Sequence, residues 1–287
     1  MIVVYSSDLH GNKELYEELL ELAEKRKARA VIIGGDLLPI HGPFQYSLQE
    51  QEEFIFSFIG SRFRDFLSRV DQATIFAMLG NDDWQASSVH LKKLADRSMV
   101  RLLHLQKHDL GDTYTVIGYS HVPPTPFTIK DGERRDLQED VVEGQRCTAC
   151  LSQHGKITVV DTHRYFMSTK SIEAELEELP EVADYGKAVY VMHSPPFHTH
   201  LDRLFDGRWI GSRAIRNFIE RNQPYLTLHG HIHESSEISG QYWDWIGKTI
   251  CINPGQSTHE LYAVVFELEN IPATLEHTVF GRMSGNA

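Results

Sequence analysis

The sequence contains few cysteines and lacks a long apolar run. Its three cysteines are too few for a disulfide framework in a chain of 287 residues. Cys147 and Cys150 form an isolated C-x-x-C with no second pair, so we interpret them as ordinary loop thiols in preference to half of a zinc site. No stretch is long enough to span a bilayer, and the strand-like residues 1–5 show no signal-peptide features. We therefore predict a cytoplasmic protein with no membrane partner.

Basic residues are also scarce relative to acidic ones. The chain has 28 lysines and arginines against 40 aspartates and glutamates, which gives a formal net charge of −12. An acidic surface repels the nucleic-acid backbone, so we expect no nucleic-acid partner. A locally positive site can still exist where bound metal ions supply the charge.

Short apolar runs alternate with stretches of helical periodicity in the first part of the chain. The strand-like runs span residues 2–5, 30–33 and 75–79. The helical patterns run from an N-capping Asn12 to about Arg26, and over residues 54–67 and 89–94. This alternation predicts parallel strands in an α/β fold.

The middle of the chain is less regular and its last third is rich in strands. We predict an irregular excursion at about residues 121–186, in which the acidic run 173–181 forms a solvated helix face. A further helix is predicted to begin at Ser212. Further strands are predicted at residues 102–105, 114–119, 188–192, 226–228, 249–252, 261–266 and 275–279. Because there is no internal repeat or low-complexity tract, we predict that residues 1–287 form a single domain.

Five of these strands are each followed at once by residues that can bind a metal ion. The residues are Asp8 and His10, Asp36, Asn81 with Asp82 and Asp83, His193, and His231 with His233. The carboxyl ends of parallel strands share one edge of a sheet, so five loops can surround one small volume there. Taken singly, each motif is ordinary turn chemistry. Their joint occurrence, in order and each directly after a strand, predicts a metal site.

The donor set favours two divalent metal ions. Carboxylate, imidazole and amide oxygen without thiolate indicate Mn²⁺, Fe or Zn²⁺, with Mn²⁺ favoured. A carboxylate can bridge two cations roughly 3.5–4 Å apart, a spacing that accommodates a shared hydroxide and a phosphate oxygen. Two such cations outweigh the charge of two ligand aspartates, so even an acidic chain can bind a small phosphorylated substrate.

The order of these motifs resembles that of the calcineurin-like metallophosphoesterase superfamily. Its pattern D-x-H, G-D, G-N, H and G-H-x-H is matched by Asp8 and His10, Gly35-Asp36, Gly80-Asn81, His193, and Gly230-His231-Ile232-His233. The resemblance covers about residues 1–260, and Asn253-Pro254-Gly255 is similar to a turn that many members carry. It implies a four-layer α-β-β-α sandwich of two mixed sheets. It also implies hydrolysis of a phosphate ester by a hydroxide that bridges two metal ions.

The resemblance further implies a role for each residue. One metal ion would be held by Asp8, His10 and His233, and the other by Asn81, His193 and His231, with Asp36 as the bridge. The catalytic set would comprise Asp36, Asn81, Asp82 and His193. Asp83 matches the acidic residue that ends the family motif, and we interpret it as a support for the ligands.

Position 82 departs from the family pattern. Many members have a histidine there, near the leaving group, which is usually assigned as general acid or transition-state stabiliser. An ionised Asp82 would oppose a phosphate unless its pKa is raised. We therefore predict a preference for phosphodiesters or other activated phosphate bonds over alkyl monoesters.

Four residues are predicted to contact the substrate: Asn81, His41, His198 and His200. For each of the three histidines, a surface or packing role is the alternative. Two other functions compete with a phosphoesterase of this kind. One is a metal-binding scaffold with weak catalysis on the same fold. The other is a DNA nuclease, which is disfavoured because the sequence shows neither a basic surface nor a segment that would cap nucleic acid.

Overall fold

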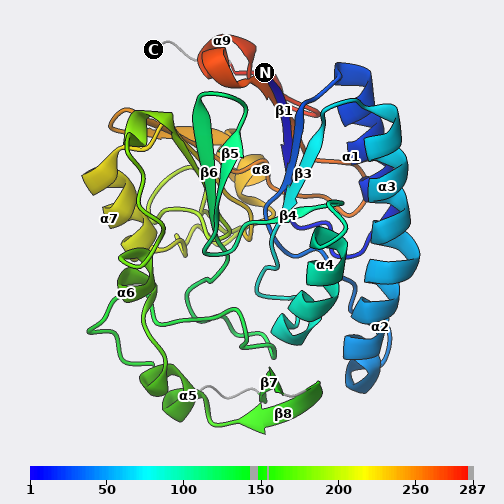
Figure 1. The fold of residues 1–287 in the computed structure, drawn as a ribbon. Coiled ribbons are helices and arrows are strands. Elements are labelled where there is room, and N and C mark those ends of the chain that lie inside the picture. Colours follow the sequence, from blue (N-terminus) through cyan, green and yellow to red (C-terminus); the bar gives the residue numbers. More distant parts are fainter. Residues whose placement is uncertain (143–147, 154, 284–287) are drawn as a thin grey trace.

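The apolar runs of the sequence become strands of two mixed β-sheets that pack face to face, with helices over each outer face (Figure 1). The computed structural model describes residues 1–142, 148–153 and 155–283, so the interpretation of Cys147 lies outside the described residues. Three apolar clusters fill the spaces between successive layers. The resulting order of layers confirms the predicted α-β-β-α sandwich.

The first sheet holds the strands that open the chain. Its order is β15 (Gly281–Arg282), β14 (Glu276–His277), β13 (Val264–Glu267), β1 (Ile2–Ser6), β2 (Ala30–Ile33), β3 (Thr74–Ala77) and β4 (Arg101–Leu102). Strands β1 to β4 are parallel, and β13 runs antiparallel to β1. The outer face is covered by α1 (Lys13–Arg26), α2 (Ser47–Phe54), α3 (Gly60–Arg69) and α4 (Ser88–Ala95).

The second sheet is built from the middle and later parts of the chain. Its order is β11 (Trp243–Ile246), β12 (Thr249–Ile252), β10 (Leu226–Leu228), β9 (Ala188–Met192), β6 (Tyr114–Tyr119) and β5 (Lys107–Leu110). The four central strands are parallel. Helices α6 (Ile172–Leu176) and α7 (Arg213–Asn222) cover its outer face. The short helices α8 (Ser235–Ser239) and α9 (Ile271–Thr274) follow later in the chain.

Strand β1 shows why the central strands have continuous apolar sequences. Val3 and Tyr5 point into the space between the two sheets, whereas Val4 points toward the helices. Both faces of the strand are therefore buried, as expected for a parallel sheet with helices on one side and a second sheet on the other. The predicted cap of the following helix is confirmed, because the Asn12 side chain accepts hydrogen bonds from the backbone N–H groups of Glu14 and Leu15.

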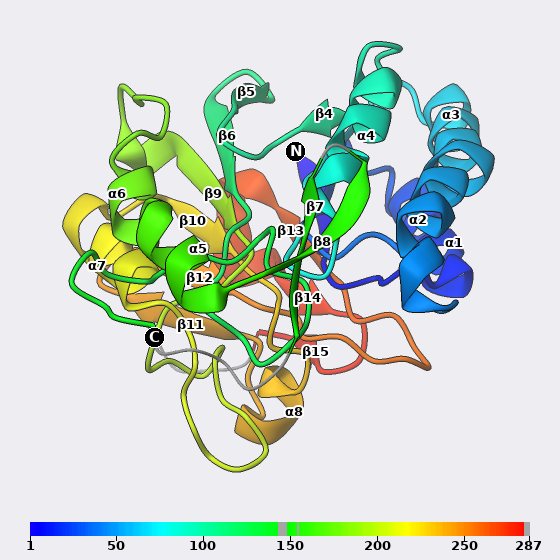
Figure 2. The same ribbon diagram turned by 90° about the horizontal axis from the view of Figure 1, so that it is seen from below.

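The predicted irregular excursion holds more regular structure than its sequence indicated. It contains the hairpin of β7 (Ala149–Gln153) and β8 (Lys156–Val160), followed by α5 (Thr162–Ser168) and α6. Figure 1 shows this hairpin at the bottom of the molecule, and Figure 2 shows it from below. The interpretation of residues 173–181 as a solvated helix face is wrong at Glu175. That carboxylate is mostly buried and accepts hydrogen bonds from Tyr119 and Arg134.

The sequence pattern did not predict β5, β11 and β15, which lie at edges of the two large sheets, or the two strands of the β7–β8 hairpin, and it predicted two other strands over too many residues. The polar strand β5 and the Trp-Asp-Trp-Ile sequence of β11 lack the continuous apolar runs that identify central strands. The strand predicted at residues 102–105 is confined to β4, and the one predicted at 275–279 is confined to β14. Edge strands bury less of their surface, so their sequences carry a weaker pattern.

Within the described ranges, no helix has both the length and the apolar character that crossing a bilayer requires.

His277 is a neutral histidine buried under the C-terminal strands. Its Nε2–H donates to the carbonyl of Pro254, and its Nδ1 accepts from the backbone N–H groups of Val279 and Phe280. Only 1% of the residue is exposed. Burial lowers its pKa to about 4, although the hydrogen bond to Pro254 acts in the opposite direction. Protonation would also remove the Nδ1 acceptor from two donors.

This histidine should make the protein less stable as the pH falls. Because its pKa is lower in the folded than in the unfolded chain, stability is fully present above about pH 6.5 and is lost as the pH falls toward 4. We expect His277→Gln to lose about 2 kcal/mol less unfolding free energy than the wild type between pH 8 and pH 5. Urea unfolding at both pH values measures this difference. The exposed His259→Gln serves as the control, and equal pH dependence of all three proteins would refute the assignment.

Candidate metal centre

All seven residues predicted to bind metal come together at the carboxyl ends of β1, β2, β3, β9 and β10 (Figure 1 labels β1 and β3, and Figure 2 labels β9 and β10). Their donor atoms form close groups in which every atom lies within 4.8 Å of the others: Asp8, His10 and His233 in one group, and Asp36, His193 and His231 in the second. Asn81 joins the second group, since its Oδ1 lies 3.2 Å from Nε2 of His193. The structure therefore brings together the residues of the two implied sets, with Asp36 grouped with His193 and His231, and their binding of metal ions stays a prediction.

Asp36 lies between the two groups. Its Oδ2 is 3.3 Å from Nε2 of His193 in the second group and 3.8 Å from Nε2 of His10 in the first. In the first group, Nε2 of His233 lies 3.3 Å from Oδ1 of Asp8 and 3.2 Å from Nε2 of His10. Donor atoms from separate loops therefore converge on one volume.

Four of the converging residues have strained backbones. Asp8, His10, Asp36 and His231 have φ angles of 59°, 43°, 48° and 67°. This left-handed region is unfavourable for residues with a side chain, although Asp and His tolerate it better than most. Such strain typically occurs where the surrounding structure imposes a functional geometry. Here it turns each chain segment sharply as it leaves a strand, which directs the side chain into the cluster.

Two glycines make room for the cluster. A Cβ atom on Gly80 would collide with Oδ1 of Asp36, and one on Gly230 would collide with Oδ2 of Asp8. Any side chain at these positions would displace a carboxylate from the cluster. The Gly before Asn81 and the Gly before His231 are thus required by close packing between loops, in addition to any turn they form.

Buried groups outside the cluster hold the loops in place. The Asp83 carboxylate accepts backbone N–H groups of Leu37, Leu38 and Gly80 at 2.8–2.9 Å, which ties the β2 loop to the β3 loop. Nδ1 of His193 is hydrogen-bonded to the carbonyl of Gly34 at 2.9 Å, so its Nε2 faces the cluster. The predicted role of Asp83 as a support is therefore visible in its contacts.

The Asn253-Pro254-Gly255 turn supports the last loop. The side-chain amide of Asn253 donates to the carbonyls of Gly230 and Ile232, on both sides of His231. Its Oδ1 accepts the backbone N–H of Gly255, so the turn itself is closed by the same side chain. The Asp8 carboxylate completes the arrangement by accepting the N–H of His231.

The buried carboxylates and imidazoles of the cluster shift one another's pKa values. Burial alone would lower the pKa of His193, but the carboxylates of Asp36 and Asp8 outweigh it and raise that pKa to about 9. Burial likewise opposes ionisation of Asp36, yet the nearby His193 and His10 hold its pKa below the usual range. Without metal, a proton on His193 thus compensates the buried carboxylates. Cation binding at Nε2 would displace that proton.

Asp82 also belongs to the cluster. Its carboxylate, His10 and Asp36 form a third close group of donor atoms, and its backbone N–H donates to Oδ1 of Asp36. Burial and the charge of Asp36 raise its pKa to about 7. Nearby divalent cations would lower that pKa again. Its position as a possible ligand was not predicted, because the family pattern places a histidine there.

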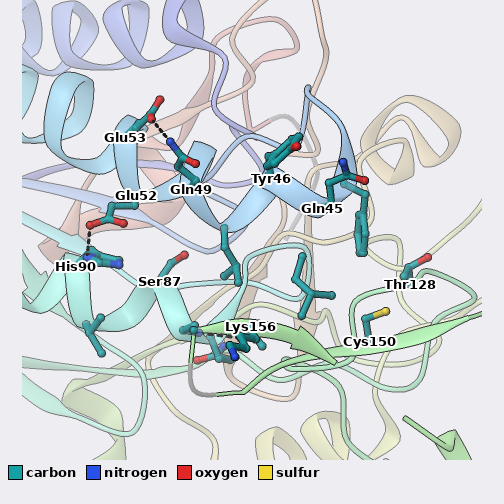
Figure 3. A pocket seen from close by; sticks show the side chains of 18 of the residues that line it. Gln45, Tyr46, Gln49, Glu52, Glu53, Ser87, His90, Thr128, Cys150 and Lys156 are labelled. Carbon is teal, nitrogen blue, oxygen red and sulfur yellow. Dashed lines mark hydrogen bonds and ion pairs between the residues drawn. The ribbon is translucent and has the colours of Figure 1, made fainter. Parts of the chain in front are cut away.

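A cavity of about 410 Å³ opens over the cluster. It is lined by Asp36, Asn81, Asp82, His231 and His233, by Ile232 and Glu234, and by mainly non-polar residues from two other segments that also carry Thr125 and Arg208. A larger hollow of about 2130 Å³ lies elsewhere, between α2, α4 and the β7–β8 hairpin (Figure 3). Its lining contains none of the seven predicted ligands. The smaller cavity is the candidate substrate site, because its lining includes residues of the convergent cluster.

The three histidines predicted to contact substrate do not line this cavity. His41 is exposed beside Glu50, with its Nδ1 3.7 Å from Oε1. The ring of His198 packs against Trp209, and Nδ1 of His200 lies 3.0 Å from Oδ2 of Asp244. These positions correspond to the packing and surface alternatives, and substrate contact by these residues stays a prediction. Asn81, in contrast, lines the cavity.

Comparison with known proteins places the chain in a family. The model of the calcineurin-like phosphoesterases matches residues 1–235, a range that includes all seven predicted ligands. The chain belongs to that family. Membership supports metal-dependent hydrolysis of phosphate esters as its general activity. No curated protein matches the chain significantly.

Solved structures share the fold of this family member at low sequence identity. One crystal structure has a TM-score of 0.62 and 15% identity, with 98% of this chain and 99% of the other covered. TT1561 of Thermus thermophilus has a TM-score of 0.57 and 17% identity, with 97% and 98% covered. A dimetal phosphatase from Danio rerio has a TM-score of 0.51 and 8% identity, with 92% and 91% covered. These likenesses establish the fold.

The hydrogen bonds of Asp83 predict how its substitution changes the stability of the protein and its affinity for metal. Asp83→Asn would place an amide N–H₂ against backbone N–H donors, so that at least one buried donor loses its acceptor. We expect a loss of about 2–3 kcal/mol in unfolding free energy and about 10–100-fold weaker metal binding. Urea denaturation and metal titration measure the two effects. The exposed turn variant Asp71→Asn is the control, and unchanged values for Asp83→Asn would contradict the supporting role.

Proposed function

We propose that the protein is a binuclear metallophosphoesterase that acts on a small substrate and prefers phosphodiesters or other activated phosphate bonds. The observation that carries this proposal is the position of Asp36. Its carboxylate faces His10 in one donor group and His193 in the other. A carboxylate shared by two donor sets is the arrangement that holds a pair of divalent cations.

The residues fit such ions. One set offers Asp8, His10 and His233, and the other offers Asn81, His193 and His231, as the family resemblance implied. Nitrogen and oxygen donors suit Mn²⁺, Fe or Zn²⁺, and we favour Mn²⁺. When bound, the ions would supply positive charge for the phosphate and lower the pKa of bound water.

The protein groups have separate tasks at this site. Asp8 and Asp36 supply the negative charge, and their burial keeps water from competing for the donor atoms. The hydrogen bond from His193 to Gly34 holds that ring in one orientation. The Asn81 amide, beside His193 and at the wall of the cavity, can orient a phosphate oxygen. Fixed positions of this kind are what a hydrolytic site requires.

The preference for diesters follows from Asp82. Its carboxylate lines the cavity and lies close to His10 and Asp36, so it faces any bound phosphate. When ionised it repels a doubly charged monoester more than a singly charged diester. Bound cations would lower its pKa again and keep it ionised, so it would not protonate a poor leaving group as an imidazolium could.

The cavity favours an enzyme over a metal-binding scaffold. A scaffold needs no enclosed space above its ligands, whereas here about 410 Å³ opens directly onto Asp36, Asn81 and Asp82. The two functions are separated by treating the protein with a chelator, restoring Mn²⁺ and measuring turnover of bis-p-nitrophenyl phosphate. Turnover that returns with the metal supports the enzyme. No turnover with Mn²⁺, Fe or Zn²⁺ supports the scaffold.

Asp36→Asn should disrupt both metal positions together. The substitution removes the negative charge that the two cations would share, so their mutual repulsion is poorly compensated. We expect metal content to fall from two ions per chain toward one or none, and turnover to fall at least ~100-fold. Elemental analysis and bis-p-nitrophenyl phosphate hydrolysis measure these changes, with the exposed Asp112→Asn as control. Two tightly bound metals with normal turnover would remove Asp36 from the centre of the proposal.

Asp82 should make the rate depend steeply on the leaving group. General acid catalysis contributes about 10²–10⁴-fold and matters most for poor leaving groups. We expect Asp82→His to flatten a plot of log kcat/KM against leaving-group pKa for a series of aryl phosphodiesters. His198→Ala and His200→Ala should leave the slope unchanged, because neither side chain lines the cavity. A shallow wild-type slope, or one that steepens in either alanine variant, would contradict this assignment.

A further inference from the structure

The cavity over the metal cluster has a non-polar part that metal binding does not explain. Two loop segments build it, one carrying Pro123, Pro124, Pro126 and Phe127 beside Thr125, and the other carrying Leu204 and Ile210 with the charged Arg208 between them. A volume of about 410 Å³ is in the range of pockets that hold a whole small ligand. A phosphate on two metal ions would fill only the polar part, so the rest is available to the organic group of the ester.

The proline-rich segment is held rigidly by a buried ion pair. Lys130 and Glu133 have side chains with no exposed surface, and their charged atoms lie 3.0 Å apart. Glu133 accepts the backbone N–H of Thr125, and Lys130 donates to the carbonyl of Thr125. Proline itself has little backbone freedom. Phe127 is therefore presented from a fixed loop, with 53% of its surface exposed.

The same segment is fitted closely to the metal cluster. A Cβ atom on Gly132, next to Glu133, would lie 2.9 Å from Cα of Asn81 and 3.0 Å from the carbonyl oxygen of Gly80. Only glycine permits this approach of two backbones. The loop that anchors the prolines therefore packs directly on the loop that carries Asn81, which sets the distance between the apolar wall and the cluster.

A second buried carboxylate holds the other segment. Asp202 is fully buried and accepts the backbone N–H groups of His198, Thr199 and Gly211 at 2.8–3.0 Å. These bonds close the loop that contains the half-buried Leu204 and Ile210. Both apolar walls are thus formed before any ligand arrives, which reduces the entropic cost of binding.

We propose that this part of the cavity is a subsite for a flat aromatic group in the organic part of the phosphate ester, with Phe127 and Leu204 as specificity-determining residues. A phenylalanine ring and proline rings offer flat apolar surfaces on which an aromatic ring can stack. The shared chemistry is that of an aryl ester or of a nucleobase carried on a nucleotide. The inference rests on the proposed function, because it takes the metal cluster as the place where the phosphate binds.

Equilibrium binding to the Mn²⁺-loaded protein tests the subsite without requiring turnover. The probes for calorimetry are inorganic phosphate, methyl phosphate, phenyl phosphate and thymidine 5′-monophosphate. We expect the wild type to bind phenyl phosphate at least ~10-fold more tightly than methyl phosphate, as the burial of an aromatic ring implies. If the nucleotide binds more tightly than phenyl phosphate, the natural group is a nucleoside. If it does not, the natural group is a simple aryl ester.

Variants of residues in the two apolar walls test whether the aromatic group binds between them. Phe127→Ala and Leu204→Ala should each reduce the advantage of phenyl over methyl phosphate to less than ~3-fold, while the affinity for inorganic phosphate changes by less than ~2-fold. Phe205→Ala is the matched control, because Phe205 is 70% exposed, adjoins Leu204 and does not line the cavity. A kinetic arm compares methyl and phenyl esters of p-nitrophenyl phosphate, which share one leaving group and so are not affected by the Asp82 argument.

The outcomes separate this inference from the proposed function. If inorganic phosphate binds and p-nitrophenyl diesters are hydrolysed, but phenyl and methyl groups are not distinguished, the subsite is wrong and the proposed function stands. The subsite is also wrong if Phe205→Ala lowers the ratio as much as the wall variants. If neither phosphate binding nor metal-dependent turnover is found, the proposed function itself fails.

Discussion

The constraint on which the structure depends is the burial of two carboxylates, Asp8 and Asp36, in one small volume. Each is 2% exposed. Buried charges of one sign are costly unless opposite charge is brought to them. Imidazoles from three loops approach these carboxylates, and although burial opposes it, the charges of Asp36 and Asp8 raise the pKa of His193 to about 9. Two divalent cations would meet the same need more fully.

Keeping these groups together explains several features that would otherwise look unrelated. Left-handed backbones at Asp8, Asp36 and His231 turn the chain directly after a strand, and glycines at positions 80 and 230 leave space for the carboxylates. The free-energy cost of these left-handed backbone conformations has to be offset by stabilising contacts elsewhere in the protein. Parallel central strands in both sheets supply the compensation, because they bring five loop starts to one edge on a rigid and fully buried core.

The same kind of hydrogen-bonded contact occurs three times around the site. Asp83, Glu133 and Asp202 are buried carboxylates that each accept backbone N–H groups from a loop. Asp83 joins two metal-binding loops, whereas Glu133 and Asp202 hold the two apolar walls of the cavity. Burial raises the pKa of all three side chains, to about 8 for Asp83 and about 7 for Glu133, but a carboxyl group still accepts several hydrogen bonds at once. The loops therefore gain rigidity without regular secondary structure, which suits a site that must hold its shape when empty.

The sequence by itself determined the central strands, the order of the motifs and the seven residues that meet at the strand ends, because apolar runs followed by Asp, Asn and His are local patterns. Only the tertiary structure decided which distant segments close the cavity. Phe127 and Leu204 approach the cluster through contacts of Glu133 and Asp202, which no local sequence pattern specifies. The edge strands β5 and β11 were missed for a related reason, since their pairing is set by neighbouring strands.

The histidines at positions 41, 198 and 200 are near the motifs in sequence, yet sequence proximity does not fix the direction of a side chain. In the folded protein they lie beside Glu50, Trp209 and Asp244 respectively.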